Sequence, residues 1–129
     1  MSGNASEIVA AFLRAFMSGD IETARRQVAE DFSFVAPMHA GSGGKQAYFA
    51  GAAAKAKCIS MFRILHQWQD GGDVSTLYEI DVKGPVGTAT LPMHEWHTVR
   101  EGKIVRTHMI FDTNAKAVHV MREALAHSH

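Results

Sequence analysis

Apolar residues near the start of the chain recur at every third or fourth position, which is the spacing of one face of an α-helix. The segment "NASEIVAAFLRAFMSGD" follows this pattern. Asn4 followed by Glu7 resembles a capping box that begins a helix, and Gly19 is placed to end it. The residues of the predicted apolar stripe are Ile8, Val9, Phe12, Leu13 and Phe16.

Two further helices are predicted in the first half of the chain, at residues 21–30 ("IETARRQVAE") and 45–56 ("KQAYFAGAAAKA"). A short strand, residues 31–37, lies between them, followed by the loop "MHAGSGG". A C-terminal helix is predicted at residues 114–127. The order of helices followed by strands is typical of an α+β fold in which the helices cover one face of a curved sheet.

After Cys58 the apolar positions alternate with polar ones, which is the spacing of a β-strand. Strands are predicted at 60–69 and 74–82, joined by the three-residue loop "DGG". The apolar face of this hairpin is predicted to look toward the helices. Its residues are Phe62, Ile64, His66, Trp68, Thr76, Tyr78, Ile80 and Val82.

The stretch from residue 90 to 112 predicts a second hairpin with Glu101 and Gly102 at its turn. In this register Trp96 lies opposite Thr107 and Val99 lies opposite Ile104. The face predicted to look toward the helices, because it is the more aromatic, carries His94, Trp96, Thr98, Val105, Thr107, Met109 and Phe111. The face predicted to meet water or a partner carries Met93, Glu95, His97, Val99, Ile104, Arg106, His108 and Ile110.

Composition limits the possible functions. A length of 129 residues suits one domain, 1–129, and 47% hydrophobic residues suit one globular core. The formal net charge is zero, which gives no footprint for nucleic acid or for a membrane. Cys58 is the single cysteine, so no intrachain disulfide forms. Together with the absence of a basic, apolar leader, this predicts a cytoplasmic protein.

The segments "FLRAFMSGDIETARRQVAEDFSFVAP", "GGKQAYFAG" and "EWHTVREGKIVRTHMIFD" make the chain resemble the SnoaL-like branch of the nuclear transport factor 2-like superfamily. The resemblance extends from about Glu7 to Asp112. It implies a cone-shaped α+β barrel, with three N-terminal helices packed in the concave face of a curved, mainly antiparallel sheet around a deep pocket. The activities it implies are those of isomerases, polyketide cyclases, dehydratases and epoxide hydrolases.

The resemblance also assigns positions to known catalytic groups. Alignment with ketosteroid isomerases puts the general-base aspartate on Ala36, the oxyanion-hole tyrosine on Phe12 and the protonated aspartate on His94. Alignment with limonene epoxide hydrolases puts the catalytic aspartate of the last strand on Met109. His94 is therefore the titratable residue that remains at a functional position.

We predict His94 and His66 as catalytic residues, since histidine exchanges protons near neutral pH. The predicted reaction is a cofactor-independent isomerisation, cyclisation or dehydration of a small hydrophobic carbonyl or hydroxyl compound. Two alternatives stay open: the histidines are ordinary core residues, and the protein is a non-catalytic ligand-binding or dimerisation module. The predicted substrate-binding residues are Trp68, Tyr78, Trp96, Thr107, Met109, Phe111, Phe12 and His39.

Glu95, His97 and His108 share the opposite face of the predicted hairpin. Two histidines and a carboxylate bind transition metals when they converge, but neighbouring side chains on one strand splay apart, so no metal site is predicted. The mixture of apolar and charged residues on this face instead predicts a homodimer formed through the outer face of the sheet.

Overall fold

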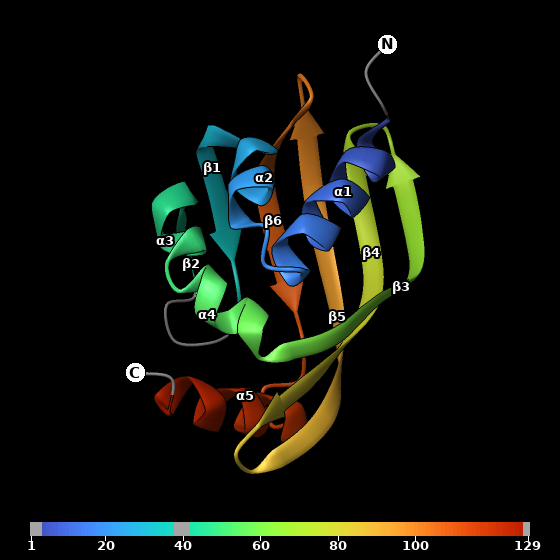
Figure 1. Ribbon diagram of the computed structural model, residues 1–129. Coiled ribbons are helices and arrows are strands. Elements are labelled where there is room, and N and C mark those ends of the chain that lie inside the picture. The colour runs from blue at the N-terminus through green and yellow to red at the C-terminus, as the bar shows by residue number, and fades with distance from the viewer. Residues whose placement is uncertain (1–3, 38–41, 128–129) are drawn as a thin grey trace.

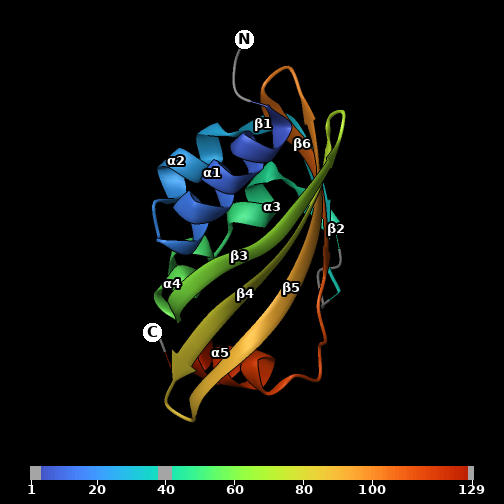
Figure 2. The same cartoon turned by 90° about the vertical axis from the view of Figure 1, so that its right-hand side faces the viewer.

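The structure is a computed structural model that describes residues 4–37 and 42–127. The helices all lie on one side of a long, curved sheet (Figures 1 and 2). The helices are α1 (Ala5–Met17), α2 (Ile21–Arg26), α3 (Lys45–Phe49), α4 (Ala52–Lys57) and α5 (Lys116–Ala126). The strands are β1 (Val28–Val35), β2 (Ser42–Gly44), β3 (Ile59–Asp70), β4 (Asp73–Gly84), β5 (Gly87–Arg100) and β6 (Lys103–Ile110).

Within the described residues, the strands form one unclosed sheet in the order β2-β1-β6-β5-β4-β3. Neighbouring strands are antiparallel except β1 and β6, which run parallel. Helices α1 to α4 cover one part of the concave face, and α5 packs against β4 and β5 at the opposite end (Figure 2). The predicted α+β architecture, with N-terminal helices on the concave face of a mainly antiparallel sheet, is confirmed.

Helix α1 begins as the sequence predicts. The Asn4 side chain accepts a hydrogen bond from the Glu7 N–H at 2.9 Å, and the Glu7 carboxylate accepts one from the Asn4 N–H at 3.2 Å. This reciprocal capping box satisfies two backbone donors at the start of the helix. The apolar stripe then buries Val9, Phe12 and Leu13 almost completely against the sheet. Helix α1 is therefore fixed over the concave face, which we call the inner face of the sheet.

Three boundaries differ from the prediction. The second helix ends at Arg26, because β1 begins at Val28 and pairs with Ile104 of β6. Sheet pairing thus overrides helix propensity in "QVAE". The predicted third helix is divided into α3 and α4, since Gly51 lies between them with a left-handed φ of 73°. Strand β2 lies within the segment predicted to be a loop.

Among the irregularities of the sheet, one bulge in β3 and one in β6 decide which side chains of the predicted site face inward. Ile64 pairs with Tyr78 but His66 pairs with Leu77, so Leu65 is an extra residue in β3. Val105 is likewise an extra residue in β6, between the pairs formed by residues 104 and 106. Because the side chains of a strand alternate, each extra residue moves the following side chains to the other face.

No helix in the described part of the chain is long and apolar enough to cross a membrane.

Candidate functional site

Strands β4 and β5 bring a tyrosine, a glutamate and a histidine together on the inner face. The Tyr78 hydroxyl donates a hydrogen bond to Oε2 of Glu95. Nε2 of His97 lies 3.1 Å from Oε1 of the same carboxylate. Thr107 of β6 is the register partner of His97. All four residues are at most 1% exposed, and we call Tyr78, Glu95, His97 and Thr107 the inner polar cluster.

Several polar atoms of this cluster have no hydrogen-bond partner among the described residues. Oε1 of Glu95 and Nε2 of His97 are within ion-pair distance but are not aligned for a hydrogen bond. Nδ1 of His97 and the Thr107 hydroxyl also lack partners. A buried polar group without a partner costs about 1–3 kcal/mol. Folded proteins keep few such groups, and a binding or catalytic role is one reason to keep them.

A second tyrosine lies close to the cluster. The Tyr48 ring of α3 packs edge-on against Phe32 and Phe34, with ring centroids 5.1 and 5.2 Å away. The residue as a whole is half-buried. Burial, and then the negative charge of Glu95, raise the pKa of Tyr48 and of Tyr78 well above the usual value. Both phenols therefore stay protonated near neutral pH, and that of Tyr78 donates to Glu95.

Aromatic rings enclose the inner polar cluster. Phe12 of α1 meets His97 edge to face at a centroid distance of 5.7 Å. Phe62 of β3 meets Tyr78 in the same way at 5.3 Å. Apolar walls lower the local dielectric constant, so electrostatic interactions with Glu95 are stronger than in water. A few polar groups in an apolar enclosure are typical of small-molecule sites.

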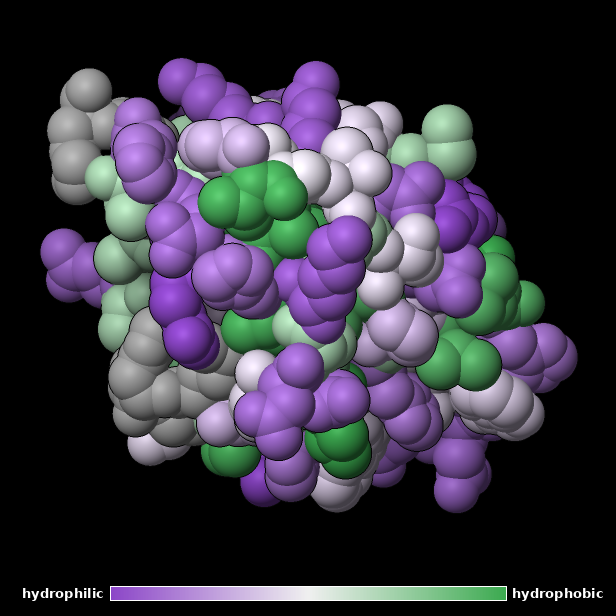
Figure 3. Space-filling view, turned by 90° about the horizontal axis from the view of Figure 1, so that it is seen from below, coloured by the Kyte–Doolittle hydropathy of each residue, from purple (hydrophilic) through white to green (hydrophobic). Residues whose placement is uncertain are grey.

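Two hollows open on the surface near the helices. The smaller, of about 360 Å³, lies between the end of α1 and the start of β3, and Met17, Met61 and Phe62 line part of it. The larger, of about 640 Å³, lies between α4, the end of β4 and α5. Figure 3 views the end of the molecule where α5 lies, and apolar side chains there lie at the surface among hydrophilic ones. Neither hollow is lined by the inner polar cluster, although Phe62 contacts both the smaller hollow and Tyr78.

The structure places some of the predicted site residues in the interior. Phe12, Tyr78 and Thr107 are fully buried, and Met109 and Phe111 pack half-buried against the core. These interior positions agree with the predicted concave surface. That the five side chains contact a ligand remains a prediction. His39 falls outside the described residues.

The interior position predicted for four other residues is wrong. His66 and Trp68 point to the outer face because the bulge at Leu65 reverses the alternation of β3. His94 and Trp96 also lie on the outer face, since β5 buries Met93, Glu95 and His97 instead. Their positions leave the catalytic roles of His94 and His66 as untested predictions.

Sequence reasoning missed Glu95, His97 and Tyr48. For Glu95 and His97 the sequence did contain a signal, in the turn that joins β4 to β5. The two-residue turn at Pro85 and Val86 pairs Gly84 with Gly87. Counting from that pair places the odd-numbered residues of β5 opposite the plainly apolar face of β4, and therefore inside.

The outer face of the sheet carries a group of rings that we call the outer aromatic patch. The His66 and Trp68 rings are 4.4 Å apart, and Trp68 lies 6.3 Å from the His94 ring. Nε2 of His94 is 2.9 Å from the Ser75 hydroxyl. The members of the patch are His66, Trp68, His94, Trp96 and His108.

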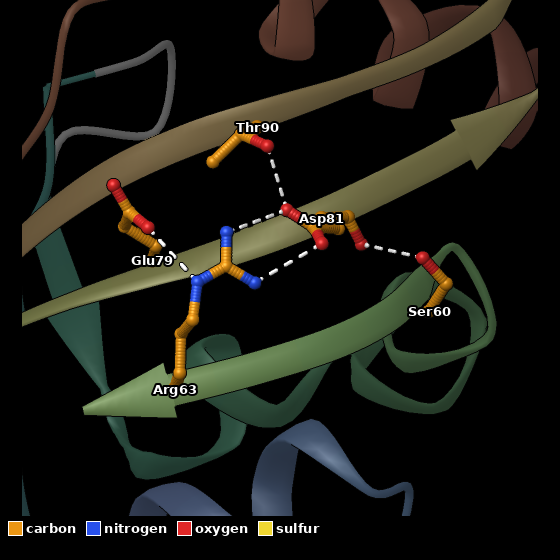
Figure 4. A network of polar contacts seen from close by, with 5 residues as sticks. All are labelled: Ser60, Arg63, Glu79, Asp81 and Thr90. Carbon is orange, nitrogen blue, oxygen red and sulfur yellow. Dashed lines mark hydrogen bonds and ion pairs between the residues drawn. The ribbon is translucent and has the colours of Figure 1, made fainter.

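The outer face also holds a set of ion pairs, shown in Figure 4, which we call the outer charged network. The Arg63 guanidinium donates two hydrogen bonds to Asp81, at 3.0 and 3.1 Å, and one to Glu79 at 2.9 Å. Thr90 donates to Asp81 at 2.6 Å, and the Ser60 hydroxyl donates to the Asp81 backbone carbonyl at 3.3 Å. Hydrogen bonds from Arg63 and Thr90 lower the pKa of Asp81, and the carboxylates raise that of Arg63.

The described residues contain no group of three His, Cys, Asp or Glu side chains that could hold a metal ion. The predicted common face of Glu95, His97 and His108 is also wrong. The bulge at Val105 turns His108 outward, while Glu95 and His97 point inward.

Comparison with known proteins agrees with this architecture. The model of the SnoaL-like domain family matches residues 9–107, so the chain belongs to the SnoaL-like domain family. The predicted family resemblance is thereby confirmed. A search of curated proteins finds no match.

Solved structures share the fold. A protein from Kribbella flavida is 26% identical, with a TM-score of 0.75 over 90% of this chain and 91% of that one. TerC, co-crystallised with polyporic acid, is 24% identical, with a TM-score of 0.74 over 92% and 98%. A putative polyketide cyclase from Pseudomonas putida is 20% identical, with a TM-score of 0.74 over 92% and 99%.

Proposed function

We propose that this protein binds a small, largely hydrophobic carbonyl or hydroxyl compound on the inner face of the sheet. Glu95 and His97 then catalyse proton transfer in an isomerisation, cyclisation or dehydration. The observation that carries the proposal is the buried Glu95–His97 pair, 3.1 Å apart, whose facing atoms have no hydrogen-bond partner among the described residues. Acid–base catalysis needs such groups within reach of a substrate proton.

The roles follow from the hydrogen bonds. Tyr78 donates to Oε2 of Glu95, which holds the carboxylate in place and leaves Oε1 free to accept a substrate proton. His97 lies beside that oxygen and can carry the proton to a second substrate atom. The Thr107 hydroxyl has hydrogen-bonding capacity to orient a substrate oxygen. The chemistry described requires no cofactor.

The smaller hollow supports a route for the substrate. Its wall includes Phe62, whose ring also packs against Tyr78. The proposed route therefore passes this half-buried ring, which has to move for a substrate to reach the inner polar cluster. Met17 and Met61 border the same hollow and supply flexible apolar surface for a hydrophobic substrate.

Binding and turnover are tested with a panel of small ketones, lactones and quinones. Polyporic acid is included because TerC was co-crystallised with it. Calorimetry reports binding, and chromatography of the mixture reports turnover. We expect Glu95→Gln and His97→Gln to keep binding but to reduce turnover by about 10²–10⁴-fold, while Glu79→Gln of the outer face keeps both. Full turnover in Glu95→Gln and in His97→Gln would exclude the proposed mechanism.

A non-catalytic ligand-binding module is the second candidate. The tight packing of Phe12 on His97 favours it, because the ring occupies space that a substrate needs. In that case the panel yields a ligand whose affinity is the same in the wild type and in Glu95→Gln, and no compound is converted.

We also propose a homodimer through the outer face of the sheet. Large apolar side chains are exposed there: Leu65 and Trp68 are each 50% exposed, Trp96 43% and Ile110 58%. Surfaces of this kind are typical of protein–protein contacts. Sedimentation should give a dimer for the wild type and a monomer for Trp68→Glu with Trp96→Glu. A wild-type monomer at high micromolar concentration would exclude the dimer.

A further inference from the structure

We propose that the larger hollow, between α4, the end of β4 and α5, binds a small amphiphilic anion: a carboxylate or phosphate joined to a short apolar body. The hollow has a volume of about 640 Å³, within the usual range for small-molecule sites. Lys57 and Lys83 line it, together with Cys58, Gly84 and alanine side chains. None of the residues assigned to proton transfer takes part, so this site goes beyond the proposed function.

The charge of the lining favours an anion. Lys57 and Lys83 are exposed and form no ion pair with any described residue, and none of the described residues that line the hollow is acidic. Lys45 is different, since it lies 3.3 Å from Glu30. The C-terminal turns of α4 and α5 border the hollow, and each contributes about half a negative charge. The full positive charges of Lys57 and Lys83 outweigh the partial negative charges of these two helix ends.

The wall between the lysines is apolar and close-packed. A Cβ atom on Gly84 would lie 2.8 Å from Cβ of Ala124, so glycine at this position allows α5 to approach β4. The methyl groups of Ala53 and Ala54 form the side provided by α4. The apolar part of a ligand would lie against these methyl groups while its charged group meets the lysines.

Cys58 forms part of the lining, with 7% of its surface exposed. Its thiol donates to the Ala54 carbonyl at 3.5 Å, and burial raises its pKa. The thiol is therefore protonated at neutral pH, and it is part of the wall rather than a nucleophile. Because Cys58 is the single cysteine of the chain, its alkylation reports on this hollow alone.

The site is tested with octanoate and octyl phosphate as probes, and with octanol and octylamine as neutral and cationic controls. Amide shifts of Gly84 and Ala124 in ¹H–¹⁵N spectra give the affinity. The rate of Cys58 alkylation by N-ethylmaleimide, an uncharged reagent, gives an independent reading. The charge-removing variant is Lys57→Gln with Lys83→Gln. Lys55→Gln with Lys116→Gln is the matched control, since it removes two exposed lysines outside the hollow.

We expect octanoate and octyl phosphate to shift the amide resonances of Gly84 and Ala124 and to slow the alkylation of Cys58. Octanol and octylamine should do neither. Removing Lys57 and Lys83 should weaken anion binding about tenfold, as expected for two exposed charge pairs, and the matched control should not. A stronger response to octyl phosphate than to octanoate would assign a phosphate, and the reverse a carboxylate.

The proposal is overturned if octanol binds as well as octanoate, if the double variant binds both anions unchanged, or if neither anion moves the amides. Glu95→Gln separates this site from the proposed function. It should reduce turnover by about 10²–10⁴-fold and leave octanoate binding unchanged, so either proposal can fail without the other.

Discussion

Strand β4 carries Tyr78 on its inner face and Glu79 and Asp81 on its outer face, so two groups of ionisable side chains lie back to back on one strand. The outer charged network is half exposed, and each of its charged groups has a hydrogen-bonded partner of opposite charge. The inner polar cluster is fully buried and leaves several polar atoms unpaired. The inner polar cluster, which is shielded from water, thus also has fewer hydrogen bonds than the outer charged network.

This difference in burial and hydrogen bonding indicates different roles for the two groups. Exposed ion pairs contribute little to folding but also cost little, because water solvates any charge that loses its partner. Buried groups carry a desolvation cost that only hydrogen bonds offset. A buried pair with free donor and acceptor atoms is therefore destabilising unless a ligand uses those atoms. The contrast supports the proposal that a ligand binds on the inner face, while the outer charged network is solvated by water.

The largest expected effect is on turnover. With a substrate from the panel, Glu95→Gln should reduce the turnover rate by about 10²–10⁴-fold, the usual contribution of a general acid or base. Glu79→Gln makes the same chemical change on the outer face and should leave the rate unaltered. Equal rates in the two variants would remove the distinction between the two groups.

The next effect is on the free energy of unfolding. Tyr78→Phe removes the donor to a buried carboxylate and should destabilise the fold by about 1–3 kcal/mol, measured by urea denaturation. Tyr48→Phe removes a phenol that has no hydrogen bond with a described residue and should cost less. A smaller loss for Tyr78→Phe than for Tyr48→Phe would show that the Tyr78–Glu95 bond does not support the fold.

Two threonine variants should differ in their effect on the free energy of unfolding. Thr107→Val removes a buried hydroxyl that has no partner and should leave stability unchanged or raise it by up to about 1 kcal/mol. Thr90→Val removes the donor to Asp81 and should lower stability slightly. Loss of stability in Thr107→Val would mean that its hydroxyl is hydrogen-bonded in solution.

The smallest effect concerns acid stability. The pKa of Asp81 is lowered in the folded state, so its contribution is present above the unfolded value of about 4 and is lost as the pH falls below it. Asp81→Asn should therefore reduce the fall in urea midpoint between neutral pH and pH 3. High salt should weaken the effect, since the network is half exposed. An identical pH dependence in the wild type and the variant would contradict this account.

The fold was predictable because local signals agree with it. The capping box of α1, the alternation of β4 and the family resemblance all point to the observed architecture. The boundary at Val28 was not predictable from propensity, because it depends on pairing with β6, which is distant in sequence.

The candidate site was predicted only in part, for two physical reasons. The bulges at Leu65 and Val105 each add one residue, and periodicity alone does not reveal them. The choice of face for β5 relied on hydrophobicity, which assigns Trp96 to the inside and Glu95 to the outside. A functional site breaks that rule, because it buries polar groups that the core would otherwise exclude.

The parallel ladder between β1 and β6 has a consequence for synthesis of the chain. Residues 28–35 leave the ribosome early but find their partner strand only when residues 104–108 have followed. Until then β1 has a single short neighbour, β2, with an exposed edge along its other side. Contacts of such long sequence separation slow folding. While β3, β4 and β5 are translated, the nascent chain thus carries an unpaired strand edge, which is covered only when β6 is free to pair with it.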